Sequence, residues 1–256
     1  MRYILFSLIF VFSLNLSGQG ELRTLNKDLP CVNKKFQVYA HVILDTLGVA
    51  NLSPSALESD LANANNAFAE ICISFELCGI DTIMNYEFDS TSTSQEEEEI
   101  VKLFHVKNRI NFYLLTTIEK DGAPVCGFAA GSVASMNNGI IFLAGACVTH
   151  ELGHLFGLPH TFENPGSELV DGSNCETAGD GICDTPADPY TGDPDIIWQG
   201  GPSGCEFIYE GLDSLGQYYQ PDVGNIMSYY SCTCGFTRQQ YIKMANTYLN
   251  SNFKMW

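Results

Sequence analysis

The stretch "VTHELGHLFGLPHTF", residues 148–162, holds three of the five histidines of this chain. On an α-helix, residues four apart lie one above the other, so His150 and His154 present two imidazoles to one point. That geometry suits two ligands of a tetrahedral zinc ion. Glu151 follows the first histidine, close enough to act on a zinc-bound water without binding the metal. The spacing therefore predicts a zinc site on a helix.

The residues after this helix predict how a third histidine reaches the same point. Gly157 can adopt a positive φ at no steric cost, so it can end the helix and reverse the chain. Pro159 cannot continue a helix and fixes φ before His160. Three neutral histidines leave one zinc position open, as in catalytic sites. The alternative is a histidine-bearing helix without metal, which five specified positions at fixed spacing disfavour.

Composition and charge limit the classes of partner. The chain has 256 residues, 45% of them hydrophobic, which is enough for one sizeable core. Its 30 acidic residues outnumber 12 basic residues and give a net charge of −18. Such a charge disfavours nucleic acid and anionic membrane surfaces, because their phosphates would be repelled. We expect neither as a partner.

The first twenty residues predict export. Residues 1–20, "MRYILFSLIFVFSLNLSGQG", contain one basic residue, an apolar run and then small residues. This pattern is typical of a secretory signal peptide, with cleavage between Ser17 and Gly20. The apolar run is short for a membrane span, although an uncleaved anchor is the alternative. Export to an oxidising compartment agrees with the ten cysteines, which predict several disulfides in a secreted protein.

Alternating and helical patterns predict an α/β chain with one catalytic domain. Residues 21–35 form a polar lead-in, and the predicted domain spans 36–256. Strands are expected at 36–44, 73–80, 109–118 and 139–145. Helices are expected at 53–71, at 148–157 and at 237–250, and a further helix is expected to start at the glutamates 96–99. The segment from the third helix to about residue 235 is rich in Gly, Pro, Asp and Cys, which indicates irregular loops.

Three motifs together resemble a known enzyme family. "HELGHLFGLPH", residues 150–160, matches the long zinc motif of the metzincin metallopeptidases. "NIMSYY", residues 225–230, matches the methionine turn of that clan, although a lone methionine is more often core filler. With "HTF" (160–162) and "GDGICDTPADP" (179–189), the chain resembles the pappalysin family over residues 36–250.

The resemblance implies roles for individual residues. His150, His154 and His160 would be zinc ligands, and Glu151 the general base that takes a proton from the zinc-bound water and passes it to the leaving amine. Met227 would form a hydrophobic floor below the metal. Tyr229 would hydrogen bond to the tetrahedral oxyanion; a purely structural tyrosine is the alternative. The segment "SYYSCTC" lacks the aspartate with which many members select basic residues.

The resemblance also implies calcium and disulfides in the lower half. The matching loop of the family binds calcium, which suggests Asp180, Asp184 and Thr185 as ligands; a solvated acidic turn is the alternative. Family members carry two disulfides among cysteines such as those found here at 175, 183, 205, 232 and 234. Two local pairs are plausible in this chain, and these are Cys72 with Cys78 and Cys175 with Cys183.

The combined prediction is a metzincin-like α/β domain. It would have a mixed twisted sheet with two long helices above an active-site cleft, and a loop-rich, disulfide-linked lower subdomain. Its activity would be hydrolysis of peptide bonds in protein substrates. An extended peptide would pair with a sheet edge, for which the strand at 139–145 is the candidate. The alternatives are a catalytically silent peptide-binding module and a zinc hydrolase of a non-peptide substrate. The oligomeric state is left open.

Overall fold

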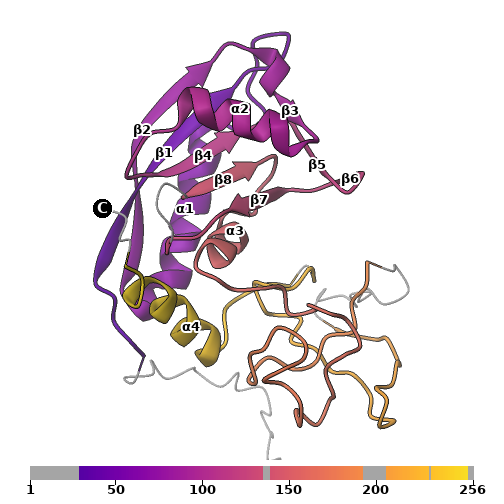
Figure 1. Cartoon of the computed structure of the whole chain (residues 1–256). Helices are drawn as coiled ribbons and strands as arrows, with labels where there is room; N and C mark the ends of the chain where they lie inside the picture. The colour runs from indigo at the N-terminus through magenta and orange to yellow at the C-terminus, as the bar shows by residue number, and fades with distance from the viewer. Residues whose placement is uncertain (1–28, 135–138, 193–205, 231, 253–256) are drawn as a thin grey trace, which may run out of the picture.

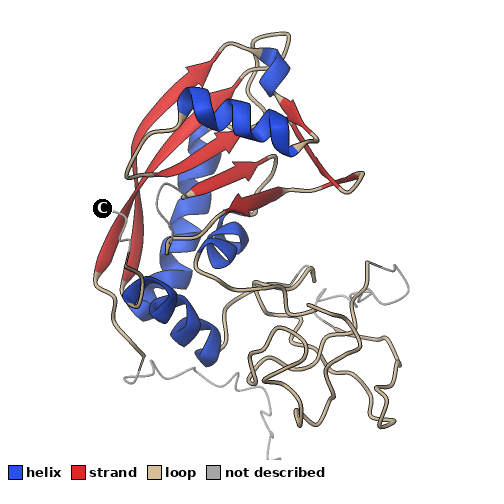
Figure 2. Cartoon of the chain, viewed as in Figure 1, coloured by secondary structure: helices blue, strands red, loops and turns tan. Residues whose placement is uncertain are grey.

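A computed structural model describes residues 29–134, 139–192, 206–230 and 232–252 of the chain. The expected signal peptide (1–20) and most of the lead-in lie outside these residues. The described chain has an upper half built on a sheet and helices and a lower half made of loops (Figures 1 and 2). Within the described residues, no helix combines the length and apolar character needed to cross a membrane.

The upper half is built on a mixed five-stranded sheet, which confirms the predicted fold class. Four strands run parallel in the order β2-β1-β4-β8, and β7 pairs antiparallel with β8 at the edge (Figure 1). Their bounds are β1 Lys34–Ile43, β2 Ile73–Ile83, β4 Ile110–Leu114, β7 Gly127–Ala130 and β8 Ile140–Leu143.

The predicted sheet edge was wrong. The strand expected at 139–145 is β8, which has β4 on one side and β7 on the other. The edge beside the histidine helix is therefore β7, at residues for which no strand had been predicted. Its sequence, "GFAA", is too short and too poor in β-branched residues to signal a strand, and its residues pair with residues ten to sixteen positions further along the chain.

Helices cover both faces of the sheet. Helices α1 (Pro54–Phe68), α3 (Val148–Leu155) and α4 (Arg238–Leu249) contribute to one apolar core. Helix α1 begins where predicted, because the Ser53 side chain accepts a hydrogen bond from the Ala56 N–H. Helix α2 (Ser94–Phe104) contributes to a second apolar cluster on the other face. A capping box of Thr93 and Glu96 starts it.

One predicted strand is divided in two. The segment 109–118 forms β4 and then β5 (Thr117–Lys120), which joins a small sheet with β3 (Ser90–Thr91) and β6 (Ala123–Pro124). The chain turns at Thr116, whose N–H donates to a carboxylate oxygen of Asp89 at 2.9 Å. This long-range contact, which the local apolar pattern does not contain, ends the first strand.

The lower half lies between α3 and α4, and its described residues contain no named helix or strand (Figure 2). A disulfide between Cys175 and Cys183 links two of its loops, as predicted. The predicted Cys72–Cys78 pair was wrong, since Cys72 bonds to Cys31 and Cys78 is an exposed free thiol. Both members of the predicted pair flank or lie on β2, where six residues span about 20 Å, too far for a disulfide.

Candidate metal centre

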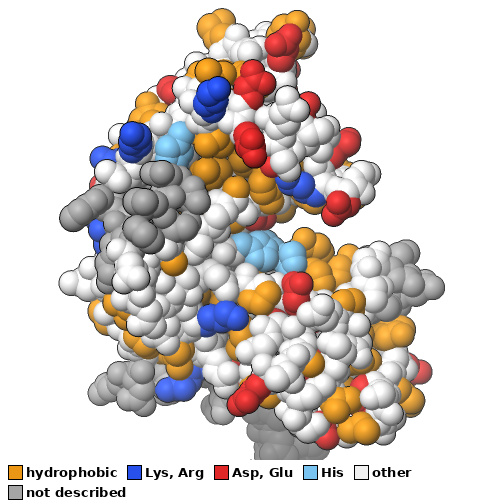
Figure 3. Space-filling model, viewed as in Figure 1, with side chains coloured by type: hydrophobic (Ala, Val, Ile, Leu, Met, Phe, Trp, Pro, Cys, Tyr) orange, Lys and Arg blue, Asp and Glu red, His pale blue; other side chains and the backbone are white. Residues whose placement is uncertain are grey.

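Helix α3 brings the three histidines of the motif together at the cleft between the two halves. Nε2 of His154 lies 3.1 Å from Nε2 of His150 and 3.1 Å from Nε2 of His160. Figure 3 shows histidine side chains at the inner end of this cleft, with apolar side chains on either side. Three ring nitrogens thus converge on one point, from two turns of one helix and from the loop that follows it.

The outer nitrogens of two rings determine what the inner nitrogens can do. Nδ1 of His150 lies 2.7 Å from the Ile226 carbonyl oxygen, and Nδ1 of His154 lies 2.8 Å from the Leu158 carbonyl oxygen. A carbonyl only accepts, so each Nδ1 carries the proton and each Nε2 exposes a lone pair. Facing lone pairs repel unless a cation lies between them. Tetrahedral zinc separates its nitrogen ligands by about 3.3 Å, so these residues fit a metal.

Burial keeps the three imidazoles in the neutral form that binds metals. It lowers the pKa of His150 to about 4, with the neighbouring His154 adding to the effect. Burial likewise lowers the pKa of His160 to about 3 and lowers that of His154. At neutral pH none of the rings needs to lose a proton before a metal binds.

Glu151 lies beside the cluster as a buried carboxyl group. Only 3% of the residue is exposed, and its Oε2 has no hydrogen-bond partner. Burial raises the pKa of Glu151 to about 8, an effect that the Ala129 N–H on β7 opposes. A buried carboxyl oxygen without a hydrogen-bond partner needs an explanation. Beside three nitrogens that can bind a metal, it fits a site in which a bound cation and a polar ligand would supply the missing interactions.

The turn after α3 carries His160 back to the cluster. Gly157 has a φ of +89°, and its N–H donates to the His154 carbonyl at 2.8 Å. A side chain at this position would also approach the Thr247 hydroxyl to 2.9 Å. Glycine is therefore required twice here, for its backbone conformation and for its close contact with α4.

Met227 and Tyr229 approach the cluster from the segment before α4. Met227 is fully buried beneath α3, where its sulfur faces Gly153. Tyr229 is 54% exposed, and its ring centroid lies 4.8 Å from that of His160 and 5.7 Å from that of His150. The methionine thus lies in the core, and the tyrosine lies on the open side of the histidines.

A hollow of about 950 Å³ extends from the histidine helix towards α1. Its described lining includes the carboxyl groups of Asp60, Glu70 and Glu151 but no Lys or Arg. Oδ2 of Asp60 is buried without a hydrogen-bond partner, and burial raises the pKa of that carboxyl group. The hollow is therefore an acidic pocket, and it opens beside the metal-competent cluster.

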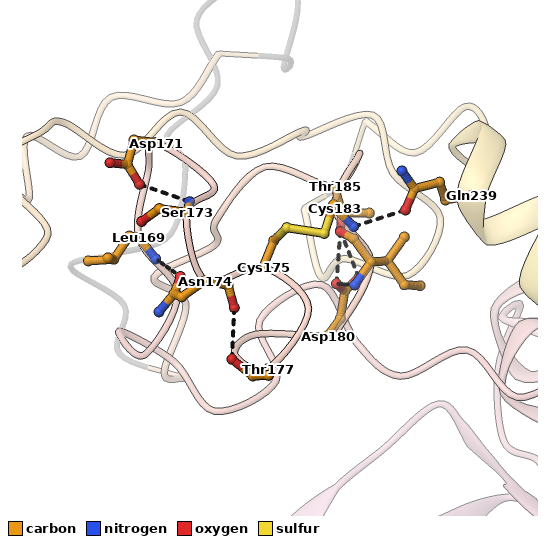
Figure 4. The surroundings of a disulfide bond; sticks show 11 residues. Leu169, Asp171, Ser173, Asn174, Cys175, Thr177, Asp180, Cys183, Thr185 and Gln239 are labelled. Carbon is orange, nitrogen blue, oxygen red and sulfur yellow. Dashed lines mark hydrogen bonds between the residues drawn. A yellow bond between two sulfur atoms is a disulfide. The ribbon is translucent and has the colours of Figure 1, made fainter.

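The acidic loop of the lower half brings Asp180 and Thr185 together (Figure 4). The Thr185 hydroxyl lies 2.9 and 3.0 Å from the two Asp180 oxygens and also contacts the Ile182 carbonyl. The Ile182 N–H also donates to Asp180 Oδ1 at 2.9 Å, and the Thr185 N–H donates to the Ile182 carbonyl at 3.2 Å, so four oxygen atoms are packed closely together in this loop.

The surroundings of Asp180 differ from the sequence-based expectation at two residues. Asp184 accepts from the Thr237 hydroxyl at 2.6 Å and the Gln239 N–H at 2.8 Å, so both its oxygens are used at the start of α4. Glu168, which was not predicted, is buried near Asp180 instead. Burial and the Asp180 charge raise the pKa of Glu168 to about 7. Glu168 lies outside the Asp-rich motif, so no local signal identifies it.

The fold and the histidine cluster define a metallopeptidase-type catalytic domain, and comparisons with known proteins identify its family. Residues 110–249, more than half of the chain, match the peptidase family described as pregnancy-associated plasma protein-A. Residues 55–161 match a reprolysin-like metallo-peptidase family. The chain therefore belongs to the first of these, the pappalysin family of metzincin metallopeptidases.

Similar proteins in fungi carry the name extracellular metalloprotease. One from Colletotrichum graminicola is 30% identical over 236 residues, covering 80% of this chain and 73% of that protein. Another from Verticillium alfalfae is 26% identical and covers 77% and 69%. One from Podospora anserina is 29% identical, and the chain spans about half of its length, 55%. Metalloproteinase-II from Bacteroides fragilis aligns with a TM-score of 0.36 and 12% identity over 53% of this chain and 46% of that one.

The packing of Met227 against α3 predicts the effect of one substitution. In an exposed helix, Gly→Ala would stabilise by about 1 kcal/mol. In Gly153→Ala, however, the added methyl would overlap the Met227 sulfur and come within 3.5 Å of Phe236. We expect overpacking to dominate, with a loss of about 1–3 kcal/mol in the free energy of unfolding. Chemical denaturation measures this; a stabilised variant would show that Met227 does not support α3 as described.

Proposed function

We propose that the chain is a secreted zinc endopeptidase that hydrolyses peptide bonds of protein substrates. The observation that carries the proposal is the convergence of three neutral Nε2 atoms beside the buried carboxyl group of Glu151. His150, His154 and His160 would hold the metal. Bound there, zinc would supply a Lewis acid that polarises the scissile carbonyl and acidifies an attacking water.

In this mechanism Glu151 moves the proton. Its carboxylate accepts a proton from the attacking water as the new C–O bond forms, and then donates it to the nitrogen of the breaking C–N bond. The surroundings of the buried Glu151 side chain support this role. Its Oε2 has no hydrogen bond that must be broken before it accepts the proton. The Ala129 N–H helps to keep the carboxylate on the side of β7.

Tyr229 and β7 would position the substrate. The exposed ring of Tyr229 beside His160 puts its side chain at the open face of the cluster, where a hydroxyl could stabilise the developing oxyanion. Among the strands that the structure describes, β7 pairs only with β8 in the main sheet, so an extended peptide could add to its other edge. Met227 and Gly157 would serve the site by supporting α3 and by turning the chain after it.

The acidic hollow suggests which side chains the enzyme accepts. A pocket that contains three carboxyl groups and no described Lys or Arg favours a cationic substrate side chain. The aspartate that performs this task in many relatives is absent from the segment after Met227. Here Asp60 on α1 and Glu70, just beyond the end of that helix, could replace it from the opposite wall.

A structural calcium ion in the lower half is a second candidate ligand. Asp180, Thr185 and the Ile182 carbonyl offer crowded oxygen atoms, and the buried Glu168 carboxyl group lies close by. Calcium binds oxygen ligands of these kinds. Asp184 belongs to this proposal only weakly, since both of its oxygens are occupied at α4.

The remaining assignments follow from the same proposal. Residues 1–20 would be a signal peptide, 21–35 a lead-in and 36–256 the catalytic domain. The substrate would be an extracellular protein or peptide, because the curated relatives are named extracellular metalloproteases. A mixed peptide library with and without chelator separates the three functions. Chelator-sensitive cleavage supports a peptidase, and binding without cleavage supports the silent module. Zinc loading with neither binding nor cleavage of peptides supports a zinc hydrolase of a non-peptide substrate.

The proton role of Glu151 predicts a selective loss of activity. Glu151→Gln keeps the side-chain size but removes the group that accepts a proton. The variant should retain one zinc per chain and an almost unchanged melting temperature, while kcat falls by about 10²–10⁴-fold, roughly 3–5 kcal/mol. Glu163→Gln, at an exposed position after the third histidine, is the matched control and should stay active. Near-normal cleavage by Glu151→Gln would remove Glu151 from the mechanism.

The acidic pocket predicts a preference for basic side chains. In peptides that differ at one position next to the cleaved bond, Lys or Arg should give a higher kcat/KM than Leu or Glu. Combining Asp60→Asn with Glu70→Gln should reduce this preference on the order of 10-fold, because a charged hydrogen bond is lost. Glu58→Gln, on an exposed position of α1 outside the pocket, should leave it unchanged. Equal cleavage of all peptides by the wild type would contradict the assignment.

The oxygen cluster predicts stabilisation by calcium. With zinc saturated, millimolar calcium should raise the melting temperature, with about 2.7 kcal/mol expected at a concentration 100 times the Kd. Glu168→Gln should weaken this response, whereas Asp171→Asn, an exposed position in the same half, should preserve it. An unchanged melting temperature of the wild type in calcium would exclude the site.

A further inference from the structure

Asp188 is a buried carboxyl group for which the proposed mechanism has no use. It is 5% exposed and precedes Pro189, which restricts its backbone to an extended conformation. No Lys or Arg of the described residues forms an ion pair with it. A buried acidic group without a cationic partner is costly unless several hydrogen bonds stabilise it.

Three donors from three segments converge on this carboxyl group. Its Oδ2 accepts from the Thr161 hydroxyl at 2.8 Å. Its Oδ1 accepts from the Tyr230 hydroxyl at 2.7 Å and from the Tyr190 N–H at 3.1 Å. Thr161 and Tyr230 are both 4% exposed, so water does not compete for these hydroxyls. A carboxylate, with acceptors on both oxygens, can serve all three donors, whereas an amide offers only one oxygen.

The partners of Asp188 are the sequence neighbours of the two groups that face the substrate. Thr161 directly follows His160, and its backbone N–H also donates to the Met227 carbonyl at 3.2 Å. Tyr230 directly follows Tyr229. The Tyr230 side chain is held inside, and the adjacent Tyr229 side chain is directed outwards, with its ring 4.8 Å from that of His160.

We propose that Asp188 is a positioning residue that couples the third histidine to the tyrosine at the open face of the site. One oxygen would hold the loop of His160 through Thr161, and the other would hold Tyr229 through Tyr230. The coupling would keep a metal ligand and an oxyanion donor at a constant separation in a half of the molecule whose described residues form no sheet. This inference rests on the proposed zinc peptidase function.

Two conservative variants test the two hydrogen bonds of this coupling separately. Thr161→Val keeps the side-chain shape and removes only the hydroxyl on the histidine side, so zinc affinity should fall on the order of 10-fold. Tyr230→Phe removes only the hydroxyl on the tyrosine side, so kcat should fall while zinc affinity and KM change little. Competition with a chromophoric zinc chelator measures the zinc affinity of Thr161→Val without an activity assay.

A double-mutant cycle tests whether Asp188 acts through Tyr229. Asp188→Asn should lower both zinc affinity and kcat, and Tyr229→Phe should lower kcat. Combined, they should cost clearly less in kcat than the product of the separate effects, because an unheld tyrosine already contributes little. Asp213→Asn is the matched control: Asp213 is a buried acceptor in the same half, bound to the N–H groups of Val170, Leu215 and Gln217. Any loss of kcat in Asp213→Asn should multiply with the loss of kcat in Tyr229→Phe.

Each outcome decides between the inference and the function on which it rests. Asp188 would have only a structural role if the separate losses of kcat in Asp188→Asn and Tyr229→Phe simply multiplied in the double variant. The same conclusion would follow if Asp188→Asn lowered the melting temperature but left zinc affinity and kcat unchanged. If Asp188→Asn does not fold, the two single-hydroxyl variants decide, and unchanged zinc affinity in Thr161→Val with unchanged kcat in Tyr230→Phe would overturn the proposal. A wild type that binds no zinc and cleaves no peptide would overturn the proposed function itself.

Discussion

Two outward hydrogen bonds control how the histidine cluster presents its free nitrogens. Because carbonyls bind Nδ1 of His150 and of His154, both rings turn a lone pair towards the same point. One carbonyl belongs to Ile226, seventy-six residues beyond His150, and the other to Leu158 in the turn after α3. The orientation of the cluster therefore depends on the segment before α4 being packed beneath the helix, which burial of Met227 achieves.

The two halves of the molecule hold this arrangement by different means. The upper half uses apolar packing between the sheet and α1, α3 and α4. A disulfide between Cys126 and Cys147 additionally joins the start of β7 to the start of α3. The described residues between α3 and α4 form no helix or strand. Buried carboxyl groups and the Cys175–Cys183 disulfide cross-link the loops there.

Three buried acids lie in different hydrogen-bonding environments. Glu151 has an unpaired oxygen at the cluster, Asp188 is saturated by hydrogen-bond donors, and Glu168 lies against Asp180 with their charges opposing each other. The number of donors around each group distinguishes these environments. A free oxygen suits proton transfer, a saturated carboxylate suits positioning, and crowded oxygens suit a cation.

The sequence alone determined what depends on nearby residues. Helical spacing placed His150 and His154 on one face, Ser53 started α1, and Gly157 lay where a positive φ is needed. Only the tertiary structure decided which strand forms the sheet edge, which cysteine bonds to Cys72, and that Glu168 joins Asp180. These features depend on segments brought together by packing. A local pattern records how a residue relates to its neighbours within a few turns, but contains no information about which distant backbone group, thiol or carboxylate will meet it.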